Sequence, residues 1–358
     1  NLEKLDLSHT RIDETELNDA IAVFAKNNPN LKKLSLDGAE ISSSMIVKLI
    51  NAFPELESIS LPNEGALDQD KIANALICSM KEGKCLKKVK GLCIENPRTL
   101  LEFAENAFSL RKISIKYESH EPIVNFAYFI RTLAKNSPNL KKFHFIDGYK
   151  KNNLSRELYQ ELPDLLPELE DMNLGMISDM KEEERADVYY RFKKMTVIDL
   201  SSFSEKHALT FIAVFSSTLI KVTYTVKSLS EDFENQFCRL LASCSRLKKL
   251  DVPNLSIENR VADFARILPY LERLNVDWRS LSETDWKIME ERYGNPYVKR
   301  IWIEVQGFFA CSLIKEPIRK IIKKCSNLEV LHVRLHNYSY DFRDIAPDSL
   351  RHAYLNQG

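Results

Sequence analysis

The sequence predicts an α/β solenoid in which short parallel strands alternate with helices along all 358 residues. Two observations lead to this prediction. A six-residue frame of the form L-x-x-L-x-L, in which other apolar residues can replace leucine, occurs 14 times at intervals of 22 to 30 residues. Between frames, the spacing of apolar residues changes from two to three and four, which indicates that a strand gives way to a helix.

The frames follow one another from one end of the chain to the other. Most carry three large apolar residues, as Leu31, Leu34 and Leu36 do. Two frames are weaker, because Gly91 stands at the third apolar position of one and Ala353 at the middle position of the last. The frames begin at Leu2, Leu31, Leu56, Leu86, Leu110, Leu140, Leu169, Met195, Leu219, Leu247, Leu271, Val298, Leu328 and Leu350. Leucine-rich repeats recur every roughly 20–29 residues, so the sequence predicts about 14 of them.

Each repeat combines a strand with a helix. Residues 31–36 alternate between apolar and polar, which predicts a short strand with one buried face. Residues 16–26 place their apolar side chains on one face of a helix, and Pro29 ends it. The same order recurs at 126–135 and 233–242. Because helices are wider than strands, the stack should curve into a horseshoe with parallel strands on the concave face and helices on the convex face.

The repeats occupy the whole sequence, which predicts a single domain over 1–358. The chain opens inside a frame at Leu2 and ends three residues after the last frame. Solenoids normally carry polar caps at their ends. We therefore expect a fragment, or a chain whose caps or flanking domains lie outside these residues.

Composition and motifs argue against an enzyme. Lys+Arg and Asp+Glu each total 51, and this zero net charge disfavours a bulk nucleic-acid binder. The sequence contains no P-loop, dinucleotide-binding, H-E-x-x-H or G-x-S-x-G motif, and only nine glycines from which to build phosphate-binding loops. The seven histidines are dispersed. We expect no catalytic residue, no metal and no cofactor.

Cysteine usage and hydropathy favour an intracellular location. The seven cysteines are scattered without a C-x-x-C pair, which is typical of buried free thiols in a reducing compartment. Cys78 in particular is expected on a buried helix face. No apolar stretch approaches the roughly 20 residues that a membrane span needs. We expect a cytoplasmic or nuclear protein that does not contact a membrane.

The third residue of each frame should point out of the sheet, away from the helices, and it is Lys or Arg in nine of the 14 frames. Further basic residues join it in the fourth to sixth frames. We define the basic strip as Lys88, Lys90, Lys112, Lys116, Lys142 and His144. Such a strip would attract an acidic or phosphorylated peptide, an inositol phosphate or a nucleic-acid backbone. The alternative is that long lysine stems merely cover the sheet while their charges stay in water.

A second candidate surface lies on the same face of the last frames. We define the C-terminal cluster as Arg300, Trp302, Glu304, His332, Arg334 and Tyr354. Trp, Tyr and Arg dominate the energetic hot spots of protein interfaces, so these residues are a candidate partner-binding site. The competing interpretation is that a flanking domain packs on them.

The junctions between helices and strands resemble those of a known family. Four of them read Asn28-Pro29-Asn30-Leu31, Ser137-Pro138-Asn139-Leu140, Cys244-Ser245-Arg246-Leu247 and Cys325-Ser326-Asn327-Leu328. They resemble the C-P-x-L junction of the cysteine-containing leucine-rich repeats of F-box proteins, with Cys244 and Cys325 at the cysteine position. Similar long repeats occur in ribonuclease-inhibitor-like proteins, immune receptors and pathogen effectors. The regular asparagine that these families carry after the strand is missing here.

The resemblance implies a non-catalytic scaffold for protein–protein interaction, such as the substrate-recognition part of an intracellular adaptor or ubiquitin-ligase receptor. A second hypothesis is that the basic strip binds an anionic ligand. A third is that the chain regulates or inhibits an enzyme, or is the repeat domain of a pathogen effector or immune receptor. The expected partner is another protein, acidic or phosphorylated, with nucleic acid ranked after it.

Overall fold

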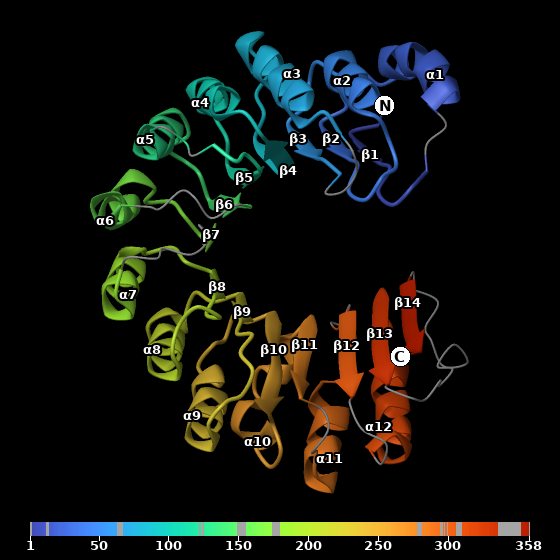
Figure 1. Ribbon diagram of the computed structural model, residues 1–358. Coiled ribbons are helices and arrows are strands. Elements are labelled where there is room, and N and C mark those ends of the chain that lie inside the picture. Colours follow the sequence, from blue (N-terminus) through green and yellow to red (C-terminus); the bar gives the residue numbers. More distant parts are fainter. Residues whose placement is uncertain are drawn as a thin grey trace. The chain divides into compact units, whose positions relative to one another are not determined.

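The computed structural model describes residues 2–357 except 12–13, 63–66, 122, 124, 149–154, 174–179, 278–280, 294–295, 297, 299, 306–309 and 336–351. The chain divides into two compact units, Asn1–Lys194 and Met195–Gly358. In each unit the helices lie on one side of the strands (Figure 1). The single domain expected over 1–358 stays a prediction.

The first unit contains parallel strands that pair in sequence order. They are β1 (Lys4–Asp6), β2 (Lys33–Ser35), β3 (Ser58–Ser60), β4 (Lys88–Ile94), β5 (Lys112–Tyr117), β6 (Lys142–Asp147) and β7 (Asp171–Asn173). The helices are α1 (Glu14–Asn27), α2 (Ser43–Ala52), α3 (Gln69–Lys81), α4 (Pro97–Asn106), α5 (Phe126–Asn136), α6 (Arg156–Leu165) and α7 (Glu182–Arg191).

The second unit repeats this order. Its strands are β8 (Val197–Asp199), β9 (Lys221–Thr223), β10 (Lys249–Ser256) and β11 (Arg273–Asp277), which pair in parallel, and β12 (Arg300–Val305), β13 (Val330–Leu335) and β14 (His352–Gln357), which form a separate parallel sheet. Its helices are α8 (Glu205–Phe215), α9 (Glu231–Leu241), α10 (Val261–Phe264), the short 3-10 helix η1 (Leu268–Tyr270), α11 (Glu283–Arg292) and α12 (Ala310–Lys324).

Each strand contains the middle apolar residue of one predicted frame, and all 14 frames have their strand. The side chains alternate as expected. In β5, Ile113 and Ile115 are buried, while Lys112 is exposed and Ser114 half-buried. The buried set packs against the helices, because successive strand residues point to opposite faces of the sheet. The predicted α/β solenoid of about 14 strand–helix repeats is confirmed.

The three helices predicted from apolar spacing are α1, α5 and α9, and each boundary lies within two residues of the expected one. Polar residues fix two of the helix starts. The side chain of Asn125 accepts a hydrogen bond from the amide of Tyr128 at 2.9 Å, and that of Ser230 accepts one from Phe233 at 3.2 Å. Both are preferred N-cap residues, since they satisfy an amide that lacks a partner within the helix.

Strand β4 departs from the predicted frame. Val89 pairs with Ile113, but the next pair along the ladder joins Leu92 to Ile115, so β4 holds one extra residue there. Gly91 lies in this bulge with a φ of 75°, a region that favours glycine. The third apolar position of this frame is therefore filled by Leu92, one residue later than the sequence pattern indicated.

The residue three places before each frame can tie neighbouring repeats together. Ser137 is 0% exposed, and its hydroxyl accepts a hydrogen bond from the amide of Leu110 at 3.0 Å and donates one to the carbonyl of Ala107. Cys244 and Cys325 occupy the equivalent position and are also buried. Their thiols donate to carbonyls of their own helices, Cys244 to Leu240 and Cys325 to Ile321, so these hydrogen bonds, unlike those of Ser137, do not join two repeats.

The cysteines with described side chains are all free. Four of them, Cys93, Cys238, Cys244 and Cys325, are buried as expected. The expected burial is wrong for Cys78, which lies on α3 and is exposed, and for Cys85, which is exposed as well.

Candidate partner-binding surface

The third position of each frame forms a row across the sheet face of the first unit. The strand register aligns Lys88 with Lys112 and Lys112 with Lys142. The row continues to Ser58 on one side and to Asp171 on the other. Because neighbouring strands lie about 4.8 Å apart, successive side chains of the row are immediate neighbours.

Asp171 neutralises one end of this row. Its carboxylate accepts a hydrogen bond from Lys142 Nζ at 2.5 Å and lies 2.7 Å from Nε2 of His144. Burial alone would raise the pKa of Asp171, but the hydrogen bonds from His144 and Lys142 outweigh burial and hold the pKa below its ordinary value. Two members of the basic strip therefore have a carboxylate partner.

Two further members are also paired with acidic side chains. Lys90 forms an ion pair with Asp37, which follows β2. Lys116 forms one with Glu118, which follows β5. The bulge in β4 also separates these two lysines, since Lys116 pairs in register with Cys93. Four of the six residues of the basic strip thus have an acidic neighbour.

Lys88 and Lys112 differ from the other four. Among the described residues, neither forms an ion pair with a carboxylate. Lys88 is half-buried, and Lys112 is exposed. Burial lowers the pKa of Lys88, and the positive charges of Lys112 and Lys90 lower it further. The positive charge of the strip is therefore concentrated on this adjacent pair.

Two lysines at the second frame position, next to this row, are compensated by carboxylates. Lys87 lies 2.7 Å from a carboxylate oxygen of Glu57, and Lys141 lies 2.6 Å from one of Glu170. Such solvent-exposed pairs contribute little to stability. They do cancel the charge of these two lysines. Arg111, at the same frame position between them, is exposed and has no ion pair among the described residues, so it adds one positive charge beside Lys112.

The second unit has a comparable lysine pair, Lys221 and Lys249, which has acidic neighbours. The register aligns Lys221 with Lys249 and Lys249 with Arg273. Arg273 forms an ion pair with Asp251 at 3.0 Å. Asp199 and Asp251 occupy the fifth position on β8 and β10, on either side of Lys221. Acidic side chains therefore accompany this pair on the neighbouring row.

The C-terminal cluster is described mainly by its backbone. The register aligns Trp302 with His332 and His332 with Tyr354. Arg300 is exposed. The side chains of the other five cluster residues lie outside the described part of the structure, so their exposure stays a prediction.

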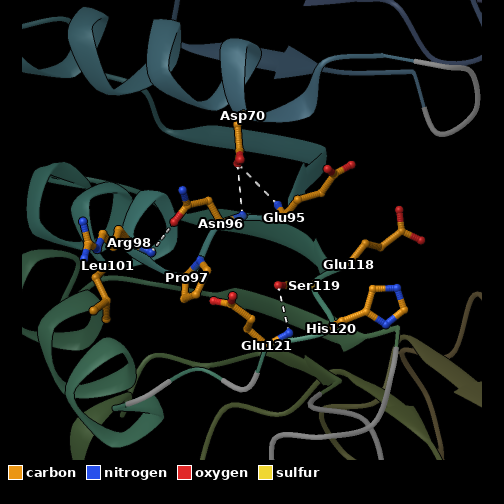
Figure 2. Close-up of a pocket in the computed structure, with 10 residues that line it drawn as sticks. All are labelled: Asp70, Glu95, Asn96, Pro97, Arg98, Leu101, Glu118, Ser119, His120 and Glu121. Atoms are coloured by element: carbon orange, nitrogen blue, oxygen red, sulfur yellow. Dashed lines mark hydrogen bonds between the residues drawn. The ribbon is translucent and has the colours of Figure 1, made fainter.

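The structure contains a pocket that the sequence did not predict. It has a volume of about 830 Å³ and is lined by Asp70, Glu95, Asn96, Pro97, Arg98, Leu101, Glu118, Ser119, His120 and Glu121 (Figure 2). Asp70 Oδ1 accepts hydrogen bonds from the amides of Glu95 and Asn96, each at 3.3 Å. The lining comes from α3 and from the segments after β4 and β5, so no local motif could have indicated it. Asp70 thus ties α3 to the segment that follows β4.

No group of three or more His, Cys, Asp or Glu side chains among the described residues is arranged to hold a metal ion. None of the helices described is both long enough and apolar enough to cross a membrane.

No family model and no curated protein matches this chain. Solved structures do resemble it. A chain in the crystal structure of the Rad7 and Elc1 complex in yeast superposes with a TM-score of 0.56 and 14% identity, over 82% of this chain and 73% of that chain. At this identity the likeness concerns the fold alone. Together with the strand–helix repeats, it gives the chain the α/β leucine-rich-repeat fold.

Two further structures are less similar. The leucine-rich repeat-containing protein LegL7 from Legionella pneumophila has a TM-score of 0.44 and 10% identity, over 81% of this chain and 98% of that chain. A chain of the TLR13–ssRNA13 complex has a TM-score of 0.37 and 14% identity, over 92% of this chain and 50% of that chain.

Proposed function

We propose that this leucine-rich-repeat chain is a non-catalytic scaffold that binds another protein through the sheet face of its repeats. The observation that carries the proposal is the row of aligned outward side chains, in which Lys88 and Lys112 have no carboxylate partner among the described residues. Charges that lack a partner within the chain can be complemented by a ligand of opposite charge. A stack of repeats holds such side chains in fixed register over an extended surface.

We further propose that the partner is a substrate of an intracellular adaptor or ubiquitin-ligase receptor in the cytoplasm or nucleus. The junctions at Cys244 and Cys325 resemble those of F-box protein repeats, and both cysteines are buried free thiols. A structure of similar fold contains Rad7 in a complex with Elc1. This example supports partner binding by a chain of this fold.

Affinity capture from the native cell tests the scaffold proposal. The sheet-face variant Lys88→Glu/Lys112→Glu is compared with the helix-face variant Lys71→Glu/Lys135→Glu, which makes the same charge change on exposed residues of α3 and α5. We expect the substrate to be lost from the first variant and retained by the second. Retention of every partner by both variants would refute binding through this face.

The same capture tests the ubiquitin-ligase version. Ligase subunits should co-purify with the wild-type chain and with the sheet-face variant alike, because the ligase would contact other residues than the substrate does. If no ligase subunit is captured with either chain, this version is rejected while the scaffold proposal stands.

The C-terminal cluster is a second proposed contact surface. Its support is the alignment of Trp302, His332 and Tyr354 on adjacent strands, since aromatic residues dominate hot spots. Trp302→Ala should then weaken capture of the partner by at least about tenfold, the loss expected for a hot-spot residue. Unchanged capture would exclude the cluster as a contact.

A further inference from the structure

We propose that Lys88 and Lys112, together with Ser58 beside them, bind the phosphate of one phosphorylated serine or threonine in the partner protein. This inference rests on the scaffold function proposed above and specifies the chemistry of its partner. It concerns one short stretch of the sheet face, from β3 to β5.

The geometry gathers donors around one point. Ser58, Lys88 and Lys112 occupy the same position on three successive strands and pair in register. The strands are about 4.8 Å apart, and a lysine ammonium sits on a long, rotatable stem with three donors. The two ammonium groups can therefore converge on one anion, and the half-buried Ser58 hydroxyl lies next to them in the row.

Acidic residues are absent from the outward positions of these strands. The fifth positions of β3 and β5 are Ser60 and Ser114, and that of β4 is Lys90, which Asp37 neutralises. Like charges directly opposite each other on a sheet are destabilising unless something offsets them. The lowered pKa of Lys88, caused by burial and then by Lys112, agrees with this repulsion. An anion bound between Lys88 and Lys112 would offset the repulsion between their charges.

The charge of the anion favours a phosphate monoester. A phosphorylated side chain carries about −1.5 to −2 at pH 7 and presents three acceptor oxygens at one point. It can neutralise both lysines at once, whereas the carboxylate of an aspartate or glutamate carries a single negative charge. The match between a lysine pair and a near-dianion is the chemical basis of the proposed specificity.

The limits of the positive region favour a single phosphate over a nucleic-acid strand. Nucleic acids bind by neutralising many successive phosphates with a long run of basic residues. Here the row meets Asp171 immediately after Lys142, and at its other end Lys4 pairs with Asp6 at 3.0 Å. Lys33, which pairs in register with Ser58, is exposed and also forms no ion pair among the described residues. Uncompensated charge on the row is therefore confined to the strands from β2 to β5, which is too few to follow a polyanion.

Lys221 and Lys249 provide a matched control for the experiment. They occupy the same frame position on adjacent strands and are both half-buried. They differ from the proposed site because Asp199 and Asp251 lie on the neighbouring row. These aspartates would repel a phosphate. Lys221 and Lys249 therefore present the same two ammonium groups but are not expected to bind a phosphate.

The test uses the full chain and a degenerate peptide library with a fixed central phosphoserine. Matched libraries carry unmodified serine or glutamate at that place, and fluorescence anisotropy measures the affinity of the selected peptides. We expect phosphoserine peptides to bind at least about tenfold more tightly than either matched form, because each charge-assisted hydrogen bond is worth a factor of ten or more. Lys88→Ala/Lys112→Ala should lose that preference, and Lys221→Ala/Lys249→Ala should keep it within about twofold.

A second variant separates loss of charge from loss of structure. Lys88→Arg/Lys112→Arg keeps both positive charges, so it should retain phosphopeptide binding within a few-fold. Equal loss in the arginine and alanine variants would overturn the inference. The absence of a phosphoserine preference would also overturn it. A third refuting result would be that these lysines bind inositol hexakisphosphate or single-stranded RNA but bind no phosphopeptide.

The inference and the scaffold proposal can fail separately. If phosphatase treatment of the native extract leaves partner capture unchanged while the sheet-face variant abolishes it, the phosphate inference is wrong and the scaffold proposal stands. If the sheet-face variant captures the same partners as the wild-type chain, the scaffold proposal itself is wrong.

Discussion

Replacing Ser137 with alanine should weaken the interface between the repeat that contains β5 and the one that contains β6. Ser137 is fully buried, and its hydroxyl accepts a hydrogen bond from the amide of Leu110 at 3.0 Å while donating one to the carbonyl of Ala107. Alanine has no polar group, so both backbone groups lose this partner inside the core. A repeat protein depends on the interfaces between neighbouring repeats, and these two bonds cross such an interface.

The expected cost follows from the two abandoned groups. Leaving a buried donor or acceptor without a partner costs roughly 1–3 kcal/mol each, so Ser137→Ala should lower the free energy of unfolding by about 2–6 kcal/mol. Ser243→Ala is the matched control. Ser243 donates to the carbonyl of Leu240 at 2.6 Å in a corresponding junction, but it is exposed. Water can replace its hydroxyl, so we expect a loss below about 0.5 kcal/mol.

Urea unfolding followed by circular dichroism measures the loss, and hydrogen exchange locates it. The amide of Leu110 should exchange at least about tenfold faster in Ser137→Ala, because its protection depends on this bond and on the local stability of the junction. A loss within about 0.5 kcal/mol of the wild type, or equal losses in Ser137→Ala and Ser243→Ala, would refute the account of the Ser137 junction as a pair of buried inter-repeat hydrogen bonds.

Three further predictions concern particular side chains. The pKa of Asp171 is held below its ordinary value in the folded chain, so its stabilising contribution is present above the unfolded pKa of 3.8 and is lost as pH falls through the folded pKa. The difference in unfolding free energy between wild type and Asp171→Asn should therefore shrink in acid titrations below pH 3.8, and a constant difference would contradict this linkage. Gly91→Ala should lower the unfolding free energy by about 1–2 kcal/mol, because a φ of 75° strains a residue that carries a side chain. An unchanged urea midpoint would contradict this backbone conformation at the bulge. Asp285→Ala should lower the unfolding free energy by about 2–4 kcal/mol. Oδ2 of this buried carboxylate accepts hydrogen bonds from the amides of Asn259 at 2.7 Å and Ser282 at 3.1 Å, and both are lost in the variant. Thermal unfolding of the variant measures the loss.

The positions of the strands and helices could be predicted from local patterns. The middle residue of every frame lies in a strand, because alternation of apolar and polar residues is a property of the strand itself and needs no knowledge of its neighbours. Helices such as α5 could likewise be predicted from apolar spacing, and the following proline stops the chain from continuing them. Recurrence of the frame was enough to indicate a parallel stack, since one repeat alone cannot bury its apolar face.

Local patterns were less informative about β4 and α3. The bulge at Gly91 shifts the third apolar position to Leu92, and only pairing with Ile115 reveals the shift. Cys78 was expected in the core but lies outside it. In both cases the sequence showed an apolar or small residue near the right place, while the side that it faces depends on how neighbouring repeats pack.

For the charge of the sheet face, the sequence and the tertiary structure supply different information. The sequence by itself determined that lysines recur at the third position of the frames and that this position faces away from the core. Only the tertiary structure decided which of them keep their charge uncompensated, because Asp37 reaches Lys90 from 53 residues away and Asp171 reaches Lys142 from the next repeat. Ion pairing depends on distances that register and loops set across repeats, and a local period carries no information about those distances.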